Sequence, residues 1–221
     1  MSTPIAQMVD EMMSEGGDAN SQESVEWLYA RVGFCTASRF ADACDLLKKG
    51  GESSKRKNYR LETVASRILQ QPIDHFVSAD MQWGTDQEPR ARMAYESATG
   101  AMVEQVGFLR HPTLEWCGGS PDGLIGADGG LEIKCPTTQT HIQTLLGAEC
   151  NYLHQCQGLM WITGRAWWDF VSYDPRMPAG LRLFIRRIER DEAFIAQMAV
   201  DVGAFLDECT AMVGELHKRL I

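Results

Sequence analysis

The chain has 221 residues, of which 44% are hydrophobic and 23% are charged, and its net charge is −9. This length fits one domain with a substantial core or at most two small ones, and we expect a single domain over residues 1–221. The composition is that of a globular protein rather than a disordered or fibrous one. The acidic total, taken alone, argues against a nucleic-acid partner, because phosphate groups select basic surfaces.

The N-terminal segment is acidic and does not resemble a secretion signal. Residues 1–30 contain six acidic residues and no Lys or Arg, so they lack the basic start of a secretion signal. No later apolar run approaches the roughly 20 residues that cross a bilayer. We therefore expect a cytoplasmic protein without a membrane partner.

Helices are expected through the first half of the chain. The spacing of apolar residues predicts helices over residues 21–32, 36–49, 59–70 and 86–99. Ser and Thr caps favour the starts of the first two. The third stops before Pro72, and Gly100 is a typical C-terminal stop for the last.

A basic segment interrupts these helices. Residues 48–60, KKGGESSKRKNYR, carry six basic residues against Glu52, a local charge of +5. Such a run is most often a solvated, mobile loop, although it can also hold DNA on one side of an acidic molecule. Lys48 and Lys49 are candidates for a contact with duplex DNA, and no base contact is assigned to them.

The second half of the chain is richer in strands. The sequence predicts strands over residues 102–111, 114–126, 131–136, 165–173 and 180–189, with helices through 149–163 and over 190–218. The ADGG turn at 127–130 is a hairpin signal. Helices on both sides of a largely antiparallel set of strands indicate an α/β fold with a central mixed β-sheet flanked by α-helices.

The hairpin SPDGLIGADGGLEIKCP, residues 120–136, places charged side chains among apolar residues and glycines. Alternate residues of a strand share a face, so Glu132 and Lys134 point one way while Ile133 points into the core. The turn can bring Asp122 opposite them. Two carboxylates at close range repel unless a cation lies between them, and oxygen ligands favour Mg²⁺ or Mn²⁺. With a lysine to orient or deprotonate water, the set fits metal-assisted phosphodiester hydrolysis.

Taken alone, this short pattern also fits a charged surface hairpin, since an Asp followed by Glu-x-Lys recurs by chance in many chains. The setting favours a metal site, because Asp122 follows a Pro at a strand end and the spacer is a true turn signal. The five histidines show no paired ligand spacing, and there is no P-loop, nucleophile elbow or dinucleotide fingerprint. We therefore expect no ATP requirement.

The motifs SPDG and LEIKCP resemble the catalytic core of PD-(D/E)xK nucleases. The wider chain resembles the bacteriophage lambda exonuclease and YqaJ-like viral recombinase family. This resemblance extends, in chain order, over GFCTASRF, WGTDQE, YLHQCQGLMWITGRAWWDFVSYDPRM and IERDEAF, and so covers nearly the whole chain. It implies a restriction-endonuclease-like core.

The resemblance also implies a catalytic set. Asp122 and Glu132 would hold Mg²⁺ together with the main-chain carbonyl of Ile133, and Lys134 would position the attacking water. Mn²⁺ is expected to substitute for Mg²⁺.

Two further residues are implied at the same site. Glu88 would lie beside it on a helix and help to hold a water molecule, although an ordinary exposed helical Glu is the plainer interpretation. Gln155 matches an active-site glutamine of the family. Gln157 lies on a different helical face and is the weaker candidate.

Arg31, Ser38 and Ser120 match positions that form a pocket for the 5′-phosphate of the degraded strand. A guanidinium with hydroxyl donors suits a terminal phosphate dianion. Without the resemblance, these residues would be a surface salt bridge and two helix caps. Met81 matches an apolar wedge that separates the terminal base pair, and a core methionine is the equal alternative.

The resemblance implies an Mg²⁺-dependent, ATP-independent exonuclease that digests one strand of linear double-stranded DNA from the 5′ end, releases mononucleotides and leaves a 3′ single strand. It further implies a ring-shaped homotrimer and a single-strand annealing protein as partner, in recombination within a phage or prophage in a bacterial host. Two alternatives stay open. One is a nuclease of the same core that has another polarity or acts as an endonuclease, and the other is a non-catalytic DNA-binding scaffold.

Overall fold

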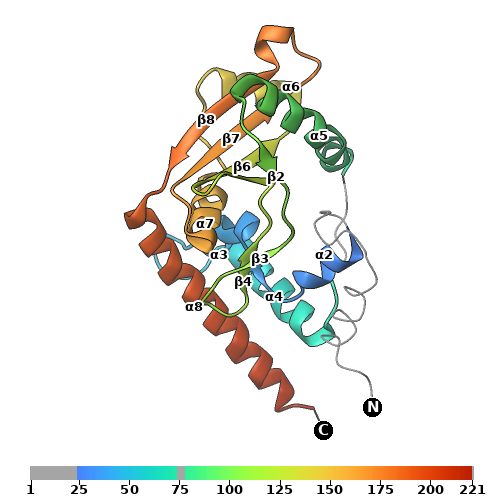
Figure 1. Cartoon of the computed structure of the whole chain (residues 1–221). Helices are drawn as coiled ribbons and strands as arrows, with labels where there is room; N and C mark the ends of the chain where they lie inside the picture. Colours follow the sequence, from blue (N-terminus) through green and yellow to red (C-terminus); the bar gives the residue numbers. More distant parts are fainter. Residues whose placement is uncertain (1–23, 74–77, 221) are drawn as a thin grey trace. The chain divides into compact units, whose positions relative to one another are not determined.

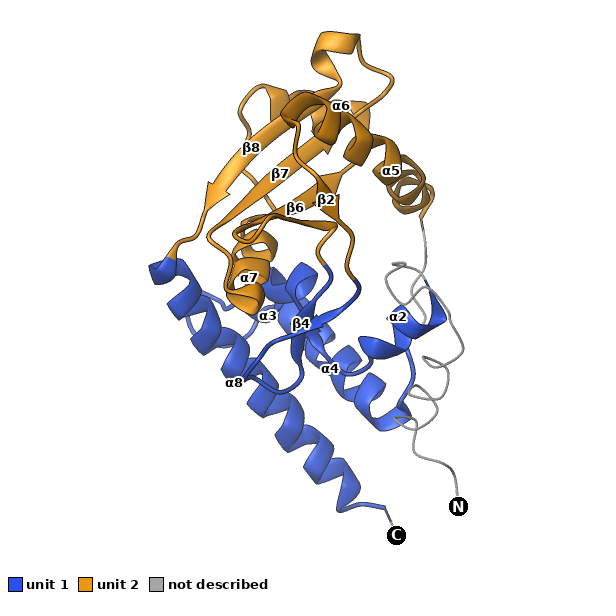
Figure 2. Ribbon diagram, viewed as in Figure 1, with its two compact units in different colours: residues 1–74, 107–120, 192–221 blue, residues 75–106, 121–191 orange. Residues whose placement is uncertain are grey.

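Residues 24–73 and 78–220 are described by a computed structural model of the chain (Figure 1). They fall into two units, each assembled from segments that are far apart in the sequence (Figure 2). Unit 1 contains 24–73, Gly107–Ser120 and 192–220, and unit 2 contains 78–106 and Pro121–Asp191. The expectation of a single domain stays a prediction.

Unit 2 is built on a five-stranded sheet with the order β2-β5-β6-β7-β8. Neighbouring strands run antiparallel except β6 and β7, which are parallel and are joined in the chain through two helices, because a parallel pair needs a crossover connection. The predicted mixed sheet flanked by helices is therefore confirmed. The elements are β2 (Val103–Glu104), β5 (Gly123–Ile125), β6 (Gly129–Lys134), β7 (Trp167–Tyr173), β8 (Leu183–Glu189), α5 (Ala79–Thr99), α6 (Thr138–Leu145) and α7 (Leu153–Thr163).

The two faces of this sheet differ in character. Leu131 and Ile133 of β6 pack with Ala91 and Tyr95 of α5 in the apolar core of the unit. Glu132, between the two apolar residues, points to the opposite face, because side chains alternate along a strand. Burial of Leu131 and Ile133 in the core thus determines that Glu132 points to the other face of the sheet.

The predicted hairpin forms between β5 and β6, with Ile125 opposite Gly129. Only a glycine fits at the start of β6, since a β-carbon on Gly129 would lie 2.1 Å from the Trp167 ring. Arg165 fastens the turn: its Nη1 donates to the carbonyl oxygens of Ile125 (3.3 Å), Gly126 (2.8 Å) and Gly129 (2.7 Å). One guanidinium therefore holds both strands of the hairpin.

Unit 1 combines a three-stranded sheet, ordered β1-β4-β3, with helices that include α4 and α8. The stacked rings of Tyr59 and Phe205, 5.1 Å between centroids, join α4 to α8. The predicted strand over 102–111 is split, because β2 belongs to unit 2 and β3 to unit 1. The elements are α2 (Val25–Ala30), β1 (Cys35–Thr36), α3 (Phe40–Ala43), α4 (Ser54–Leu69), β3 (Leu109–Arg110), β4 (Cys117–Gly119) and α8 (Glu192–His217), with short 3-10 turns at η1 (Ala37–Arg39) and, in unit 2, η2 (Ala179–Leu181).

The basic segment is partly structural. Arg56 is buried, and its guanidinium binds both oxygens of Glu208, Nη1 at 2.8 Å and Nη2 at 3.0 Å. Arg60 donates to Glu208 (2.6 Å) and to Glu52 (2.5 Å). The interpretation as a mobile loop is therefore wrong for these two arginines, which lie on α4. The exposed cations of the segment are Lys48, Lys49, Lys55 and Lys57.

Two predicted helices are shorter than expected. The helix predicted over 36–49 ends at Ala43, whose carbonyl accepts from Arg56 Nε at 2.9 Å instead of continuing the helix. The helical stretch through 149–163 begins only at α7, and Gly147, with φ +90°, lies in the break that separates it from α6.

Two predicted helices are longer than expected. The helix predicted over 59–70 begins at Ser54, after the Ser53 cap. The helix predicted over 86–99 begins at Ala79, because the Ser78 hydroxyl caps it by accepting from the Met81 N–H at 3.2 Å. Its predicted stop is confirmed, with Gly100 in the left-handed region at φ +70°. No helix in the described part of the chain is long and apolar enough to cross a membrane.

Replacing Arg165 with alanine should destabilise the protein by about 1–2 kcal/mol, because three hairpin carbonyls lose a charged donor. Urea unfolding followed by circular dichroism measures this change. Arg90→Ala, which removes an exposed arginine from α5, is the matched control and should stay within about 0.5 kcal/mol of the parent. Equal stability of the two variants would contradict the role of Arg165.

Candidate active site

Asp122, Glu132 and Lys134 come together in unit 2. Asp122 immediately precedes β5, and the pairing of Gly123 with Leu131 places it beside the later half of β6. Its Oδ2 accepts the main-chain N–H of Ile133 at 2.6 Å. Asp122 is 8% exposed and Glu132 is fully buried. The hairpin thus holds two carboxylates away from water.

The two oxygens of Glu132 differ in their partners. Oε1 accepts from Gln155 Nε2 at 2.7 Å and lies 2.5 Å from Lys134 Nζ. Oε2 is buried and has no hydrogen-bond donor among the residues that the structure describes. A buried carboxylate oxygen in this state is costly, by about 1–3 kcal/mol or more for a charged group. It is therefore a position where a ligand is expected.

Burial and mutual repulsion set the charges of this site. Burial, together with the negative charge of Asp122 and against the opposing effect of Lys134, raises the pKa of Glu132 to about 8. Burial also raises the pKa of Asp122, while Lys134 and the Ile133 N–H lower it. Burial would lower the pKa of Lys134, but the two carboxylates outweigh it and raise that pKa. One lysine therefore only partly compensates two buried acids.

Glu88 lies on α5, where it forms an ion pair with Arg92 one turn later. Its negative charge acts on Glu132 and raises the pKa of that carboxyl. Glu88 is therefore close enough to influence the site electrostatically, and it also has a partner on its own helix. Its predicted role of holding a water molecule stays a prediction.

Gln155 and Gln157 face different partners, as their helical spacing predicts. Gln155 bonds the Glu132 carboxylate from α7. The amide of Gln157 is engaged by the main chain, donating to the Glu189 carbonyl at 2.8 Å and accepting from the Asp191 N–H at 3.0 Å. Gln155 is thus a member of the acidic cluster, while Gln157 ties α7 to the end of β8.

The donor set fits a divalent cation. Two buried carboxylates, one with an unbonded oxygen, present hard oxygen ligands, which Mg²⁺ and Mn²⁺ prefer. Within 24–73 and 78–220 there is no cluster of three or more His, Cys, Asp or Glu side chains that could hold a metal. A metal at this site would therefore rely on Asp122, Glu132 and the predicted main-chain carbonyl of Ile133, with water or substrate completing the ligands.

A second cluster forms in unit 1 around Arg31. Its guanidinium carbon lies 4.0 Å from the centre of the Trp27 ring, and Trp27 Nε1–H donates to Ser120 Oγ at 2.9 Å. Desolvation lowers the pKa of Arg31. Among the described residues, no carboxylate is bonded to this guanidinium. The cluster joins Arg31 to Ser120, two of the three residues predicted for the phosphate pocket, and its chemistry suits an anion.

Ser38 and Met81 are both at the surface. Ser38 is exposed in η1, and its hydroxyl lies 3.3 Å from Thr36 Oγ1. Met81 lies in the first turn of α5 with an exposed fraction of 55%. The alternative of a core methionine is therefore wrong, and the wedge role stays a prediction.

Two aromatic residues beside these clusters escaped the sequence analysis. Trp27 supports Arg31 from one turn earlier in α2, and this i, i+4 spacing was the signal that could have found it. The ring of Tyr152 lies 5.0 Å from Lys134 Nζ and stacks on Phe170 at 5.4 Å. No local pattern connects Tyr152, at the start of α7, with a lysine on β6, so only the tertiary fold reveals this contact.

Comparisons with known proteins identify the family. The YqaJ-like viral recombinase domain matches residues 26–166, more than half of the chain. The chain belongs to this family.

Two solved structures of an alkaline exonuclease resemble this YqaJ-like chain over most of its length. An alkaline exonuclease from Laribacter hongkongensis is 43% identical, with 89% of this chain and 97% of that chain covered and a TM-score of 0.83. Its complex with dAMP gives 42% identity over the same shares of the two chains, with a TM-score of 0.83.

More distant comparisons involve two further proteins. A phage-related exonuclease from Haemophilus somnus, 15% identical with a TM-score of 0.65, covers 83% of this chain and 96% of its own and shares the fold. A putative uncharacterized protein, ExoD, from Escherichia coli K12 is 35% identical over 66 residues, which are 29% of this chain and 74% of that protein. The predicted family is thus confirmed.

Asp122→Asn should make the metal-free YqaJ-like protein more stable, by about 1–2 kcal/mol, because it removes one of two repelling buried charges while its amide oxygen can still accept from Ile133. Thermal unfolding in a chelator measures this. Mg²⁺ should then raise the unfolding midpoint of the parent and not that of the variant, since only a protein that binds the ion is stabilised by it. Asp128→Asn, in the exposed turn of the same hairpin, is the control. A variant that is less stable in chelator, or that responds to Mg²⁺ as the parent does, would contradict the metal site.

Proposed function

We propose that this chain is a metal-dependent exonuclease that acts on linear double-stranded DNA. It digests one strand from the 5′ end with Mg²⁺ and without ATP, releases mononucleotides and leaves a 3′ single strand. The observation that carries the proposal is the buried, unbonded Oε2 of Glu132, a carboxylate that pairs with Lys134 through Oε1 and is repelled by Asp122. The relatives support it, because one is an alkaline exonuclease and was solved with dAMP, a mononucleotide of the kind that such a reaction releases.

The side chains of the site have distinct tasks in this proposal. Asp122 and Glu132, with the carbonyl of Ile133, would hold Mg²⁺, which when bound supplies positive charge to the phosphate. Gln155 fixes the Glu132 carboxylate through Oε1 and leaves Oε2 for the ion. Lys134 donates from Nζ, orients water for attack on phosphorus and stabilises the negative charge that develops there. Attack by water breaks the bond from phosphorus to the 3′ oxygen of the terminal nucleotide.

The cluster in unit 1 supports a preference for a 5′-phosphate end. Arg31 is desolvated, rests on Trp27 and has no bonded carboxylate among the described residues, so a phosphate would supply the missing negative partner. Ser120 is fixed by the Trp27 N–H, which leaves its hydroxyl proton free to donate. Ser38 joins this pocket in the proposal through the family resemblance.

The assembly and setting of the enzyme belong to the same proposal. A ring-shaped homotrimer would keep hold of duplex DNA despite the net charge of −9, because a closed ring does not depend on strong attraction. A single-strand annealing protein would load onto the exposed strand, in the cytoplasm of a bacterial host. These features rest on the family alone.

The decisive experiment incubates linear duplex, labelled at one 5′-phosphate end, with the protein in Mg²⁺ or in chelator. We expect labelled mononucleotide as the first product, only with the metal, and no cutting of closed circles. Lys134→Ala should bind the duplex as the parent does and cleave it about 10²- to 10⁴-fold more slowly. Lys218→Ala, which removes an exposed lysine outside the basic segment, should cleave normally. Retention of the 5′ label on strands that shorten progressively, or cutting of circles, would point to a different nuclease. DNA binding without any hydrolysis would leave only a scaffold.

Replacement of Arg31 by alanine should reduce the preference for phosphorylated ends. A charge-assisted contact to phosphate is worth about 1.5–3 kcal/mol, so the ratio of cleavage rates on 5′-phosphate and 5′-hydroxyl duplexes should fall by about 10- to 100-fold. Arg110→Ala is the control, since Arg110 is an exposed arginine of the same unit whose guanidinium lies over a ring, that of Phe34. An unchanged ratio in Arg31→Ala would remove the phosphate pocket from the proposal.

A further inference from the structure

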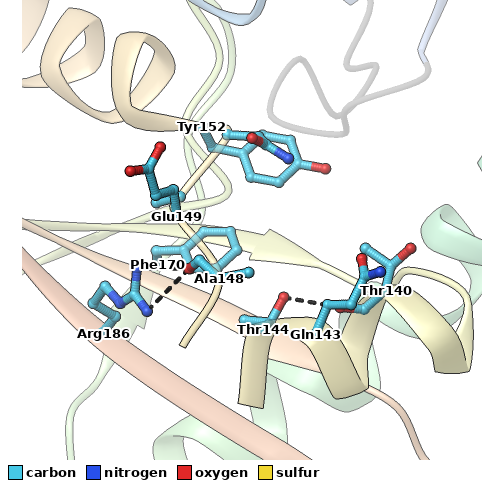
Figure 3. A pocket seen from close by; sticks show the side chains of 10 residues that line it. Thr140, Gln143, Thr144, Ala148, Glu149, Tyr152, Phe170 and Arg186 are labelled. Atoms are coloured by element: carbon cyan, nitrogen blue, oxygen red, sulfur yellow. Dashed lines mark hydrogen bonds between the residues drawn. The ribbon is translucent and has the colours of Figure 1, made fainter. Parts of the chain in front are cut away.

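A cavity opens beside the acidic cluster of unit 2, between α6 and the sheet (Figure 3). Its volume is about 50 Å³, enough for about four water molecules, so it can admit part of a planar ring rather than a whole nucleotide. Polar side chains of α6 form one wall and aromatic side chains form another. The lining residues that matter are Thr140, Gln143, Thr144, Tyr152, Phe170 and Arg186.

Strand register places this cavity next to the catalytic carboxylate. Phe170 of β7 is paired with Glu132 of β6 and, on its other side, with Arg186 of β8. Residues paired across strands share a face, and neighbouring strands are about 4.8 Å apart. The cavity residues Phe170 and Arg186 therefore lie about one and two strand spacings from Glu132, a separation comparable with one nucleotide.

Tyr152 connects the cavity to the catalytic lysine. Its ring stacks on Phe170 with an interplanar angle of 20°, and its centroid lies 5.0 Å from Lys134 Nζ. The same ring thus lines the cavity and contacts the cation that we assign to the attacking water. A group bound in the cavity would therefore be separated from Lys134 only by the Tyr152 ring.

The lining suits a nucleobase better than a phosphate. Aromatic rings offer stacking to the face of any base, which is tolerant of sequence. The Gln143 amide can both donate and accept, and the Thr144 hydroxyl, which donates to the Thr140 carbonyl at 3.1 Å, keeps lone pairs for a base amino group. Arg186 adds a donor, while the carboxylate of Glu149 in the same lining repels a phosphate. Adaptable groups of this kind accept all four bases, as a nuclease that digests a whole strand requires.

We propose that this cavity receives the edge of the nucleobase of a nucleotide that flanks the scissile phosphate. The inference rests on the proposed function, because it assigns a substrate contact to the same site. The base belongs either to the terminal nucleotide, which is excised, or to the second nucleotide, which becomes the new end. A base held beside Lys134 positions the scissile phosphate at the catalytic residues for each successive cleavage.

The test uses duplexes in which the base of nucleotide 1 or of nucleotide 2 from the 5′-phosphate end is replaced by an abasic tetrahydrofuran. Single-turnover cleavage of the first bond is measured for the parent, for Q143A/T144A and for Gln139→Ala. Gln139 is an exposed glutamine one turn earlier on α6 and lies outside the cavity lining, so it is the matched control. Neither substituted position in the double variant belongs to the proposed catalytic set.

In the parent, removal of the base at one of the two positions should slow cleavage about tenfold, and that position identifies the occupant. Q143A/T144A should cleave intact duplex about fivefold more slowly, and its abasic penalty should fall to about twofold or less, as expected when the contact is already lost. Gln139→Ala should keep the full penalty. A second readout compares inhibition by dAMP with inhibition by 2-deoxyribose 5-phosphate, which lacks the base. We expect dAMP to inhibit the parent and Gln139→Ala more strongly than the sugar phosphate does, and this difference should shrink only in Q143A/T144A.

If the parent cleaves intact duplex but shows no abasic penalty at either position, the inference is wrong and the proposed function stands. The same holds if the parent and the double variant show equal penalties. A parent that cleaves no duplex at all would overturn the proposed function and the inference with it. Cleavage of intact duplex by the double variant shows that it is folded.

Discussion

The burial of Asp122 and Glu132 side by side is the constraint on which the site in unit 2 depends. Two desolvated carboxylates face one lysine, and one carboxylate oxygen is left without a donor. Such a cluster is tolerated only where the surrounding fold over-determines it. Here the apolar neighbours of Glu132 on β6, the tight packing at Gly129 and the Arg165 contacts to the hairpin carbonyls supply that fixation. These contacts offset the free-energy cost of keeping two buried carboxylates where a cation could bind.

The parts of this site that could be predicted from the sequence are those set by local geometry. Asp122, Glu132 and Lys134 lie on one hairpin, so strand alternation and a turn signal sufficed to bring them together. Gln155 was inferred from the family resemblance and not from spacing. Tyr152 and the cavity behind it required knowledge of which strands pair, because Glu132, Phe170 and Arg186 form a row only after β6, β7 and β8 are aligned.

Two errors in the predicted fold came from side chains that act on segments distant in the sequence. The helix expected over 36–49 stops where Arg56 takes the carbonyl of Ala43, and periodicity holds no information about that contact. Likewise, Arg56 and Arg60 counted as available charge in the basic segment until Glu208, far away on α8, was found to bind both. Charge runs reveal what a segment carries but not which charges are already paired. By contrast, Gly100 ended its helix as predicted because a left-handed cap is decided locally.

The stacking of Trp27 on Arg31 also has a consequence for ionic strength. Dissolved ions screen exposed charges over about 8 Å at physiological ionic strength, and they screen partly buried charges much less. The lysines of the basic segment are exposed, so any attraction between them and a polyanion would weaken steeply as salt rises. The guanidinium beneath the indole keeps its attraction under the same conditions. If the chain acts as we propose, added salt would therefore shift its binding away from continuous nucleic-acid backbone and toward a single terminal anion.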